Sequence, residues 1–373
     1  MKYRVTCLTP TLVGDGQRLS PIDYMVWKDH VNVLDQRRIF KLLSRGPRLE
    51  GYLAQLKRAE RLDFASWGGF AQNFAGRRIP FEHASAAAAW ERARPEHLFI
   101  PTFANSPSGP YLPATAVKGA LRTGAVAERW TEATLTHLAA RIEDRVPRYF
   151  ASKAEEAVLG GGGSNRMKRV GASDSSTISH AAMKVYLLRI STLVARGGGK
   201  LELGWKSERG SGRVDDATPL FAEMTMPGTS FEGIWTESSD QDRARLFRAS
   251  NAYAESLLAR HRDYAEQTGM KRLTANLDQL SAKLSEVREG HQACLLSIGW
   301  GGGLLGKSAY TKTDDEPYRQ ILRHVPIYQR AIQTGLPFPK TRKVIFENNE
   351  PASLPGWVLL EVLSPADCSE GTV

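Results

Sequence analysis

The segment that most constrains this chain joins an extended stretch to a helix with one apolar and one cationic side. Residues 111–124 read YLPATAVKGALRTG. Pro113 ends the extended stretch, and Thr115 is the predicted N-cap, because its hydroxyl can accept a hydrogen bond from an otherwise unpaired backbone N–H. Lys118 and Arg122 follow, one helical turn apart on the same face.

The opposite face of this predicted helix is small and apolar. It carries Val117, Ala120, Leu121 and Gly124. A buried stripe therefore opposes two cations close to a helix N-terminus, where free backbone N–H groups already favour anions. The pattern predicts a seat for a phosphate group.

A glycine-rich segment near the C-terminal end of the chain offers two readings. Residues 301–308, GGGLLGKS, satisfy the pattern G-x-x-x-x-G-K-[ST] of P-loop NTPases. A P-loop needs a long helix and further strands after it, whereas Pro317 interrupts the segment that follows here. An ATPase is therefore the weaker hypothesis. The stronger one is a loop whose backbone approaches a large anion.

The side chains beside these glycines suit such a loop. Trp300 would serve as a flat anchor and Lys307 as a point charge. The RNA contacts that the sequence predicts are Thr115, Lys118, Arg122, Trp300, Gly301, Gly302, Gly303, Lys307 and Ser308.

The chain is basic. Its 373 residues carry 50 Lys and Arg against 40 Asp and Glu, a formal net charge of +10. This balance is explained equally well by a polyanionic partner and by a soluble protein whose surface is simply basic. The basic residues form two clusters, Arg37, Arg38, Lys41, Arg45, Arg48, Lys57, Arg58 and Arg61, and then Arg166, Lys168 and Arg169. Such clusters suit a phosphate backbone, or they form solvated helix faces.

Cysteine usage and hydropathy indicate the compartment. Cys7, Cys294 and Cys368 form no C-x-x-C pair, so neither a disulfide framework nor a cysteine zinc site is predicted. No apolar run approaches the roughly 18 residues of a membrane helix, and the first residues do not resemble a signal peptide. We expect a cytoplasmic protein without a membrane partner.

Hydrophobic periodicity predicts an α+β fold with two β-rich halves and helical insertions. Strands are expected at 2–8, 24–27, 31–34, 98–103, 182–194, 231–236 and 294–298, and helices at 36–44, 51–61, 84–94, 113–130 and 132–144. The first strand, hairpin and helix are typical of the opening of a ferredoxin-like unit.

Three predicted segments follow from this pattern. Residues 1–158 form an N-terminal half with a helical insertion, and residues 159–171 form a glycine-rich mobile loop. Residues 172–373 form a C-terminal β-rich half. That half contains an inserted pair of helices over 239–290, broken at Gly269, and the glycine-rich loop 299–308.

Four motifs, in this order, resemble the RAMP superfamily, the repeat-associated RNA-binding proteins of CRISPR systems. They are LTPTLVGDGQRLSPIDYMVWKDHVNVLD (8–35), PYLPATAVKGALR (110–122), VGASDSS (170–176) and GWGGGLLGKS (299–308). The resemblance covers nearly the whole chain and is greatest to the fifth subunits of type III-A Csm effector complexes. Ala172 departs from it, because the family commonly has a bulkier apolar residue before Ser-Asp-Ser.

The resemblance implies a modified ferredoxin-like, RRM-related fold. It also implies a crRNA-binding subunit that caps the backbone filament near the crRNA 3′ end and supports crRNA maturation or assembly in antiviral defence. The implied partners are crRNA, other Csm subunits, especially the backbone RAMP subunit, and target RNA in the assembled ribonucleoprotein. No cofactor is implied, and the subunit would contribute no nuclease chemistry.

The alternative is a metal-dependent RNA endonuclease. Backbone subunits of such complexes cleave target RNA with an aspartate in the loop after the first strand, where Asp15 and Asp23 lie. Each has a structural explanation as a turn residue, which we favour. Asp174 likewise suits an Asx-turn or a helix cap better than a metal site. The eight histidines show no metal-ligand spacing, and none is next to either phosphate-binding motif in the sequence. We therefore predict no metal site and no catalytic residue.

Overall fold

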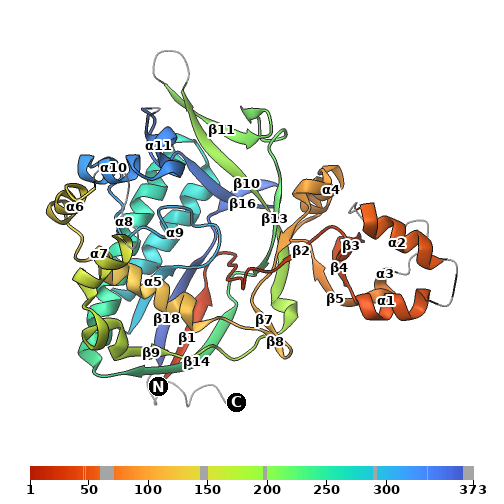
Figure 1. Ribbon diagram of the computed structural model, residues 1–373, viewed down its shortest axis with the longest axis horizontal. Coiled ribbons are helices and arrows are strands. Elements are labelled where there is room, and N and C mark those ends of the chain that lie inside the picture. Colours follow the sequence, from red (N-terminus) through yellow and green to blue (C-terminus); the bar gives the residue numbers. More distant parts are fainter. Residues whose placement is uncertain are drawn as a thin grey trace.

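Two antiparallel sheets and an outlying lobe make up the protein (Figure 1). The computed structural model describes residues 1–44, 46, 48–58, 71–142, 150–195, 200–288, 292–333 and 335–363. Within these ranges, no helix combines the length and the apolar character that crossing a membrane requires.

The first sheet has five strands in the order β15-β18-β1-β14-β9, and every pairing is antiparallel. The strands are β1 (Lys2–Cys7), β9 (Val170–Ala172), β14 (Ser230–Glu237), β15 (Ala293–Ser297) and β18 (Trp357–Leu363). Because successive strand residues point to opposite sides, β1 buries Tyr3, Val5 and Cys7. The N-terminal strand is thus central to the sheet.

The chain passes through this sheet as strand, helix, strand, strand, helix, strand. The helices are α5 (Ala114–Ala127), between β1 and β9, and α8 (Asp240–Gln267), between β14 and β18. α5 and α8 cross closely at Gly124, where a Cβ atom would lie 2.8 Å from Cα of Ser250. β1 precedes residues 159–171, whereas its neighbours β14 and β18 follow them. The domain boundary predicted there stays a prediction, but strands from both sides of it share one sheet.

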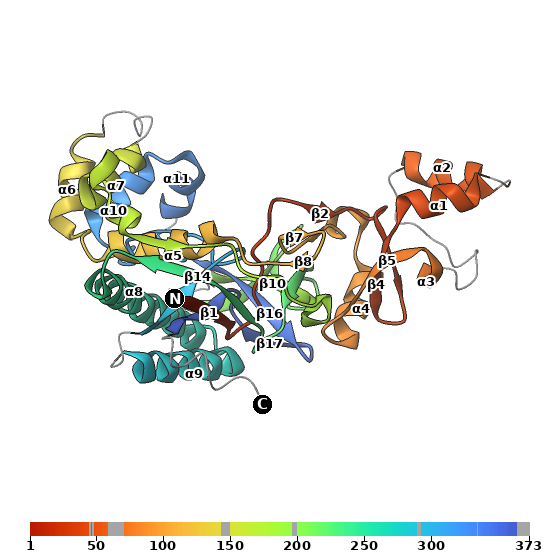
Figure 2. The ribbon, with the colours of Figure 1, turned by 90° about the horizontal axis from the view of Figure 1, so that it is seen from below.

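Two helices lie within the segment 239–290, where the inserted pair was predicted. α8 and α9 (Lys271–Val287) lie between β14 and β15, and they are separated at Gly269, whose φ is +67°. The predicted leucine stripe is buried, including Leu257, Leu273 and Leu277. These helices therefore complete the core beside the first sheet (Figure 2).

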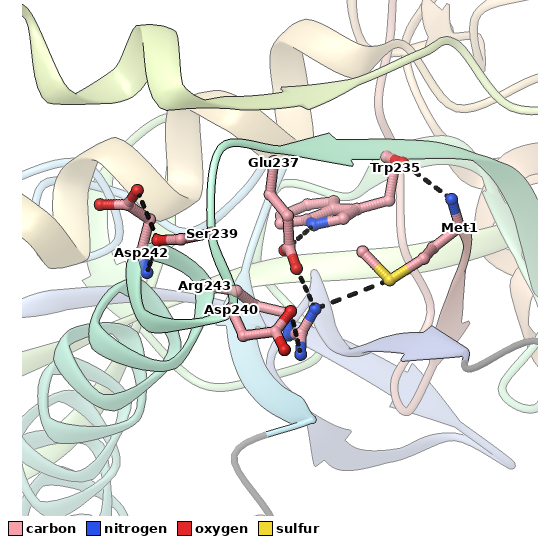
Figure 3. Close-up of polar contacts among 7 residues, drawn as sticks. All are labelled: Met1, Trp235, Glu237, Ser239, Asp240, Asp242 and Arg243. Carbon is pink, nitrogen blue, oxygen red and sulfur yellow. Dashed lines mark hydrogen bonds and ion pairs between the residues drawn. The ribbon is translucent and has the colours of Figure 1, made fainter.

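The first turn of α8 is fixed to β14 and to the N-terminus of the chain (Figure 3). Ser239 is the N-cap of the helix. Arg243, one turn later, forms an ion pair with Glu237 of β14, and both side chains are buried. Nη1 of Arg243 also lies 3.8 Å from Sδ of Met1, while the amino group of Met1 donates to the carbonyl oxygen of Trp235 at 3.2 Å. This network sets where α8 begins on the sheet.

The second sheet is built around one long strand, β10 (Met183–Ala195). Its order is β12-β11-β10-β16-β17, and β13 also pairs with β10. These strands are β11 (Leu201–Ser207), β12 (Gly210–Gly212), β13 (Leu220–Thr225), β16 (Thr341–Glu347) and β17 (Glu350–Ser353). The N–H of Thr225 donates to the carbonyl oxygen of Thr11 at 2.9 Å, so the loop after β1 joins the two sheets. One hydrophobic core runs through both.

The outlying lobe corrects one prediction. The hairpin β3 (Tyr24–Trp27) and β4 (His30–Leu34) does not continue the sheet of β1 but pairs with β5 (Ala75–Pro80). With α1 (Gln36–Leu43), α2 (Arg48–Arg58) and α3 (Ala71–Phe74), these strands form a separate body with its own core (Figures 1 and 2). The predicted opening of a ferredoxin-like unit over residues 2–44 is therefore wrong, because strand patterns fix a buried face but not a partner.

The remaining strands and α-helices are short. They are β2 (Arg18–Leu19), β6 (Ile100–Pro101), β7 (Asn105–Ser106), β8 (Gly109–Pro110), α4 (Ala84–Arg92), α6 (Glu132–Ala139), α7 (Phe150–Leu159), α10 (Glu316–Arg323) and α11 (Pro326–Gln333). The strand predicted at 98–103 is reduced to β6. Parts of two predicted helices, residues 59–61 and 143–144, lie outside the described residues.

The predicted irregular loop at 159–171 contains regular structure. Leu159 ends α7 and is buried, and two turns of 3₁₀ helix follow at Gly162–Ser164 and Arg166–Arg169. Val170 then starts β9. The glycine content suggested a linker, but pairing with β14 orders the end of this segment.

Candidate nucleic-acid interface

The N-terminus of α5 differs from the prediction. Pro113 is the N-cap position and makes no side-chain cap, and Thr115 lies inside the first turn with an exposed side chain. The capping oxygen comes instead from Asp174, whose Oδ1 accepts a hydrogen bond from the N–H of Ala114 at 2.7 Å. The prediction of Thr115 as the cap is wrong, because the helix begins one residue before Thr115 and a carboxylate remote in sequence accepts the hydrogen bond of its first N–H.

The Ser-Asp-Ser segment holds the start of α5 against the first sheet. Ser175 Oγ accepts from the N–H of Leu112 at 2.9 Å, and Ser173 Oγ accepts from the N–H of Ile234 of β14 at 2.9 Å. Asp174 lies between these two serines. Of the two roles that the sequence left open for Asp174, an Asx-turn or a cap, the structure shows a cap, and the helix that it caps is remote in sequence.

The two cations of α5 are not equivalent. The buried face is as predicted, with Val117 and Leu121 fully buried. Arg122 is about half exposed and forms an ion pair with Glu155 of α7. No ion pair is found for Lys118 within the described residues, and its side chain is partly exposed. Lys118 is therefore the more available of the two charges.

The glycine-rich loop after β15 depends on glycine at particular positions. Gly299, Gly301 and Gly303 have φ values of +75°, +104° and +65°. A Cβ atom at Gly299 would lie 2.2 Å from the carbonyl oxygen of Leu12, because this loop runs against the loop after β1. At Gly302, in contrast, the nearest atoms to a Cβ would be 3.5 Å away. At Gly302 the loop thus has room for a Cβ atom.

The side chains of the loop differ in their contacts and exposure. The N–H of Trp300 donates to the carbonyl oxygen of Leu12 at 2.7 Å, and Nζ of Lys343 lies 3.9 Å from the centre of the indole ring. Lys307 is exposed. The hydroxyl of Ser308 is 3.0 Å from the carbonyl oxygen of Tyr310 and 2.6 Å from the hydroxyl of Tyr318. The role of Ser308 as an RNA contact stays a prediction, but its hydroxyl already has two internal partners.

The surroundings of the loop are not those of a P-loop. β15 pairs antiparallel with β18 at the edge of the first sheet, and no helix begins at Ser308. The next helix, α10, begins at Glu316. The expectation that the G-x-x-x-x-G-K-S pattern lacks the NTPase context is confirmed.

Comparison with protein families identifies the class of protein. A family model, "RAMP superfamily", matches residues 4–369 of the chain. The chain belongs to the RAMP superfamily. No curated protein matches this RAMP protein.

Two solved structures are similar to the RAMP protein over nearly its whole length. One is a chain of the cryo-EM structure of a "Csm-crRNA-target RNA ternary complex in type III-A CRISPR-Cas system", with 17% identity and a TM-score of 0.66, covering 97% of this chain and 100% of that one. The other is the crystal structure of Csm5 from T. onnurineus, with 15% identity and a TM-score of 0.57, covering 95% and 99%. At these identities the likeness is one of fold.

Asp15 and Asp23 each make local bonds in the RAMP protein. Oδ1 of Asp15 accepts from the N–H of Gln17 at 3.0 Å, and Oδ2 of Asp23 accepts from the N–H and the hydroxyl of Ser20 at 2.7 and 2.6 Å. These are the turn roles expected from the sequence.

One group of side chains in the described residues has the spacing of metal ligands: Glu96, His97 and Glu208. Arg94 Nη1 lies 2.6 Å from Oε2 of the Glu208 carboxylate, and His97 Nε2 lies 2.7 Å from Oε1. The hydrogen bond with His97, followed by the charge of Arg94, lowers the pKa of Glu208. Arg94 and His97 therefore already occupy the carboxylate that a metal would need.

A pocket of about 150 Å³ adjoins the glycine-rich loop and was missed by the sequence analysis. Gly301 to Gly303 line it together with Lys206 of β11, His261 of α8, and Arg342 and Lys343 of β16. No histidine neighbours the loop in sequence, but folding brings His261 there from α8. The only sequence signal for Arg342 and Lys343 was their charge, which they share with many surface residues.

Proposed function

We propose that this RAMP protein is the crRNA-binding, Csm5-type subunit of a type III-A CRISPR effector complex. The observation that carries the proposal is the match along 97% of the chain to all of one subunit of a Csm-crRNA-target RNA complex. In the proposed role, the protein caps the backbone filament near the crRNA 3′ end and supports crRNA maturation or assembly. Its partners are crRNA, the backbone RAMP subunit and other Csm subunits, with target RNA in the assembled complex, and it acts in the cytoplasm in antiviral defence.

The first sheet supports the finer fold assignment that we propose, a modified ferredoxin-like, RRM-related unit. Its chain order β1, α5, β9, β14, α8, β18 follows the β-α-β-β-α-β pattern of that unit. In space β1 lies between β14 and β18, with β9 outside β14. The strand β15 and the helix α9 are the additions that modify it.

The proposed RNA contact combines α5 with the glycine-rich loop. Lys118 provides a partly exposed charge without an ion pair among the described residues, and Lys307 provides a second exposed charge. Gly302 has no side chain that would hold a ligand away from the backbone of the loop. Phosphate groups suit all three, because they accept hydrogen bonds from backbone N–H groups and from cations alike.

We propose that the subunit contributes no nuclease chemistry. Asp15 and Asp23 have turn-forming partners, which accounts for both without catalysis. Purified protein incubated with labelled RNA and Mg²⁺ should leave the RNA intact. Cleavage that disappears with Asp15→Ala or Asp23→Ala would replace the proposal with the endonuclease alternative.

Co-purification tests the assignment to a complex. The tagged protein, expressed with the other subunits and a CRISPR array, should recover the backbone subunit together with RNA whose sequences map to repeat and spacer. RNA of unrelated sequence, or no RNA and no backbone subunit, would contradict the proposal.

A further inference from the structure

The pocket beside the glycine-rich loop contains a guanidinium group that no carboxylate neutralises in the part of the chain that the structure describes. Arg342 Nη1 donates to the carbonyl oxygens of Pro339 and Thr341 at 2.7 and 2.9 Å, and its guanidinium carbon lies 4.4 Å from the centre of the Tyr264 ring. Burial lowers the pKa of Arg342 to about 10. Nη1 is therefore occupied, whereas no hydrogen-bond partner is found for Nη2 within the described residues.

The rest of the pocket adds positive charge. None of the side chains that line it within the described residues is acidic. Lys206 and Lys343 line it as well, and the pKa of Lys343 is lowered by burial and by the nearby charge of Lys307. Lys206 is exposed, whereas Arg342 and Lys343 are partly buried. Withdrawing such charges from water without an anionic partner is costly, so the pocket favours a bound anion.

His261 of this pocket is a neutral imidazole that can donate a hydrogen bond. Nε of Arg342 always carries a proton, and it donates to Nδ1 of His261 at 3.0 Å. The proton of the imidazole therefore resides on Nε2. Burial, followed by the charge of Arg342, lowers the pKa of His261 well below its usual value. Because Nδ1 is already an acceptor for Arg342, His261 is poorly suited to act as a general base and well suited to donate a hydrogen bond.

The size of the pocket restricts the ligand. At about 150 Å³ it is smaller than the roughly 300–1,000 Å³ of pockets that enclose drug-sized molecules. Its donors are a guanidinium, ammonium groups, an imidazole N–H and the backbone of Gly301 to Gly303. A phosphate group matches both the volume and the donors, because its oxygens can accept hydrogen bonds from Nη2 of Arg342, from ammonium groups and from backbone N–H groups at the same time.

We propose that this pocket binds one phosphate group of the RNA strand that passes the glycine-rich loop, with Arg342 as its principal ligand. The inference rests on the proposed function and deepens it, because it places a phosphate between the first sheet, which carries the loop, and the second sheet, which carries Arg342. The phosphate is either an internal phosphodiester or a terminal phosphate, and the experiment separates the two.

The test is RNA binding by the full-length protein across a salt series, with two oligoribonucleotides that differ only in a 3′-phosphate or a 3′-hydroxyl. The variants are Arg342→Gln and Lys206→Gln, and the control is Lys271→Gln, an exposed lysine that does not line the pocket. Lys206 is exposed, so its variant keeps the test valid even if Arg342→Gln fails to fold. Stability is followed in parallel by thermal unfolding with and without inorganic phosphate.

We expect Arg342→Gln to weaken RNA binding about tenfold or more, as for the loss of a hydrogen bond to a charged group. Each variant should also lower the logarithmic salt slope by roughly 0.7, whereas Lys271→Gln should match the parent. Equal effects on both RNAs indicate an internal phosphate, and an effect confined to the 3′-phosphorylated RNA indicates a terminal one. Either result supports the proposal.

Three results would overturn it. If both pocket variants bind RNA like the parent, the pocket has no phosphate of the RNA, although the proposed function stands. If inorganic phosphate raises the melting temperature of the parent but not of the variants, while RNA binding is unchanged, the pocket takes a free anion instead. If the parent binds neither RNA, the proposed function fails together with the inference.

Discussion

The carboxylate of Asp174 occupies the N-terminus of α5, where its Oδ1 accepts a hydrogen bond from the N–H of Ala114 at 2.7 Å. The sequence suggested this helix end as a phosphate seat. A negative charge is already present there, so a phosphate at the same place would be repelled. The contact that α5 can offer RNA is therefore limited to its side chains, Lys118 above all.

Removing the Asp174 cap should measurably lower the stability of the protein. Replacing Asp174 with Ala removes the acceptor for the N–H of Ala114 and should lower the free energy of unfolding by about 1 kcal/mol. Asp174→Asn keeps an acceptor oxygen and should lose less. Denaturant unfolding measures both, with Asp216→Ala, an exposed aspartate, as the control for charge. Equal stability of Asp174→Ala and the parent would show that the cap contributes nothing.

Local elements could be predicted from the sequence, and their partners could not. The pair α8 and α9, with its break at Gly269, follows from helical periodicity and one glycine. The neighbours of β1, however, begin at Ser230 and Trp357, more than half the chain away. Strand alternation gives the buried face of β1 but leaves its partners open, so the hairpin of the lobe was wrongly placed beside it.

Some residues of the candidate site could likewise be predicted from the sequence, and others could not. Lys118, Gly302 and Lys307 belong to motifs that are visible as short runs in the sequence. Arg342 and His261 lie 81 residues apart and meet only through the packing of β16 on α8. Asp174 reaches α5 across 60 residues. Such tertiary contacts leave no local pattern, because each residue alone resembles an ordinary polar residue.

A buried ion pair fastens the outlying lobe to the body. Arg77 of β5 lies 2.6 Å from the carboxylate of Glu223 of β13, which is fully buried. Arg77→Met leaves that carboxylate without a partner and should destabilise the protein by about 3–5 kcal/mol. Adding Glu223→Gln should restore part of the loss. Arg78→Met, an exposed arginine on the same strand, should have little effect in the same unfolding experiment.

The loss of stability caused by Arg77→Met should depend on pH. The pKa of Glu223 is raised, because burial outweighs the attraction and hydrogen bonding of Arg77. A carboxyl whose pKa is higher in the folded than in the unfolded protein adds stability below its unfolded pKa, and this stability is lost as the pH rises through the folded pKa. Removing Arg77 raises the folded pKa further. The destabilisation by Arg77→Met should therefore be smaller at about pH 5 than at about pH 7.5, and a larger loss at the acidic pH would contradict this account.

Asp15 and Asp23 are predicted to be dispensable for RNA cleavage. Asp15→Ala and Asp23→Ala each remove turn-forming hydrogen bonds, to Gln17 and Ser20 respectively, but no catalytic group in our proposal. In the assembled complex, target RNA should be cut at the same sites and rates as with the parent protein. A cleavage product that disappears while the complex remains intact would assign the chemistry to this subunit.

The cations of α5 should differ in their contribution to RNA binding. Because Arg122 is paired with Glu155, Lys118→Ala should account for most of the weakening seen when both are replaced. The double variant should bind all RNA sequences more weakly and lower the logarithmic salt slope by roughly 0.7 for each phosphate that is no longer neutralised. Glu155→Gln releases Arg122 and should tighten binding. Unchanged affinity of the double variant at every salt concentration would mean that α5 is structural.

A side chain at Gly302 tests whether the backbone of the glycine-rich loop contacts RNA, because it would exclude a phosphate sterically. A Cβ atom there would meet Gly306 and Ser297 only at 3.5 Å, so the protein itself has room for a Cβ atom. Gly302→Val should therefore keep the melting temperature close to that of the parent but hold an RNA phosphate away from the backbone, with Gly302→Ala intermediate. No charge is removed, so the salt slope of the remaining binding should stay near the parent value, unlike that of the Lys118 and Arg122 variants. If Gly302→Val folds and binds RNA as tightly as the parent, the backbone of this loop does not approach the RNA.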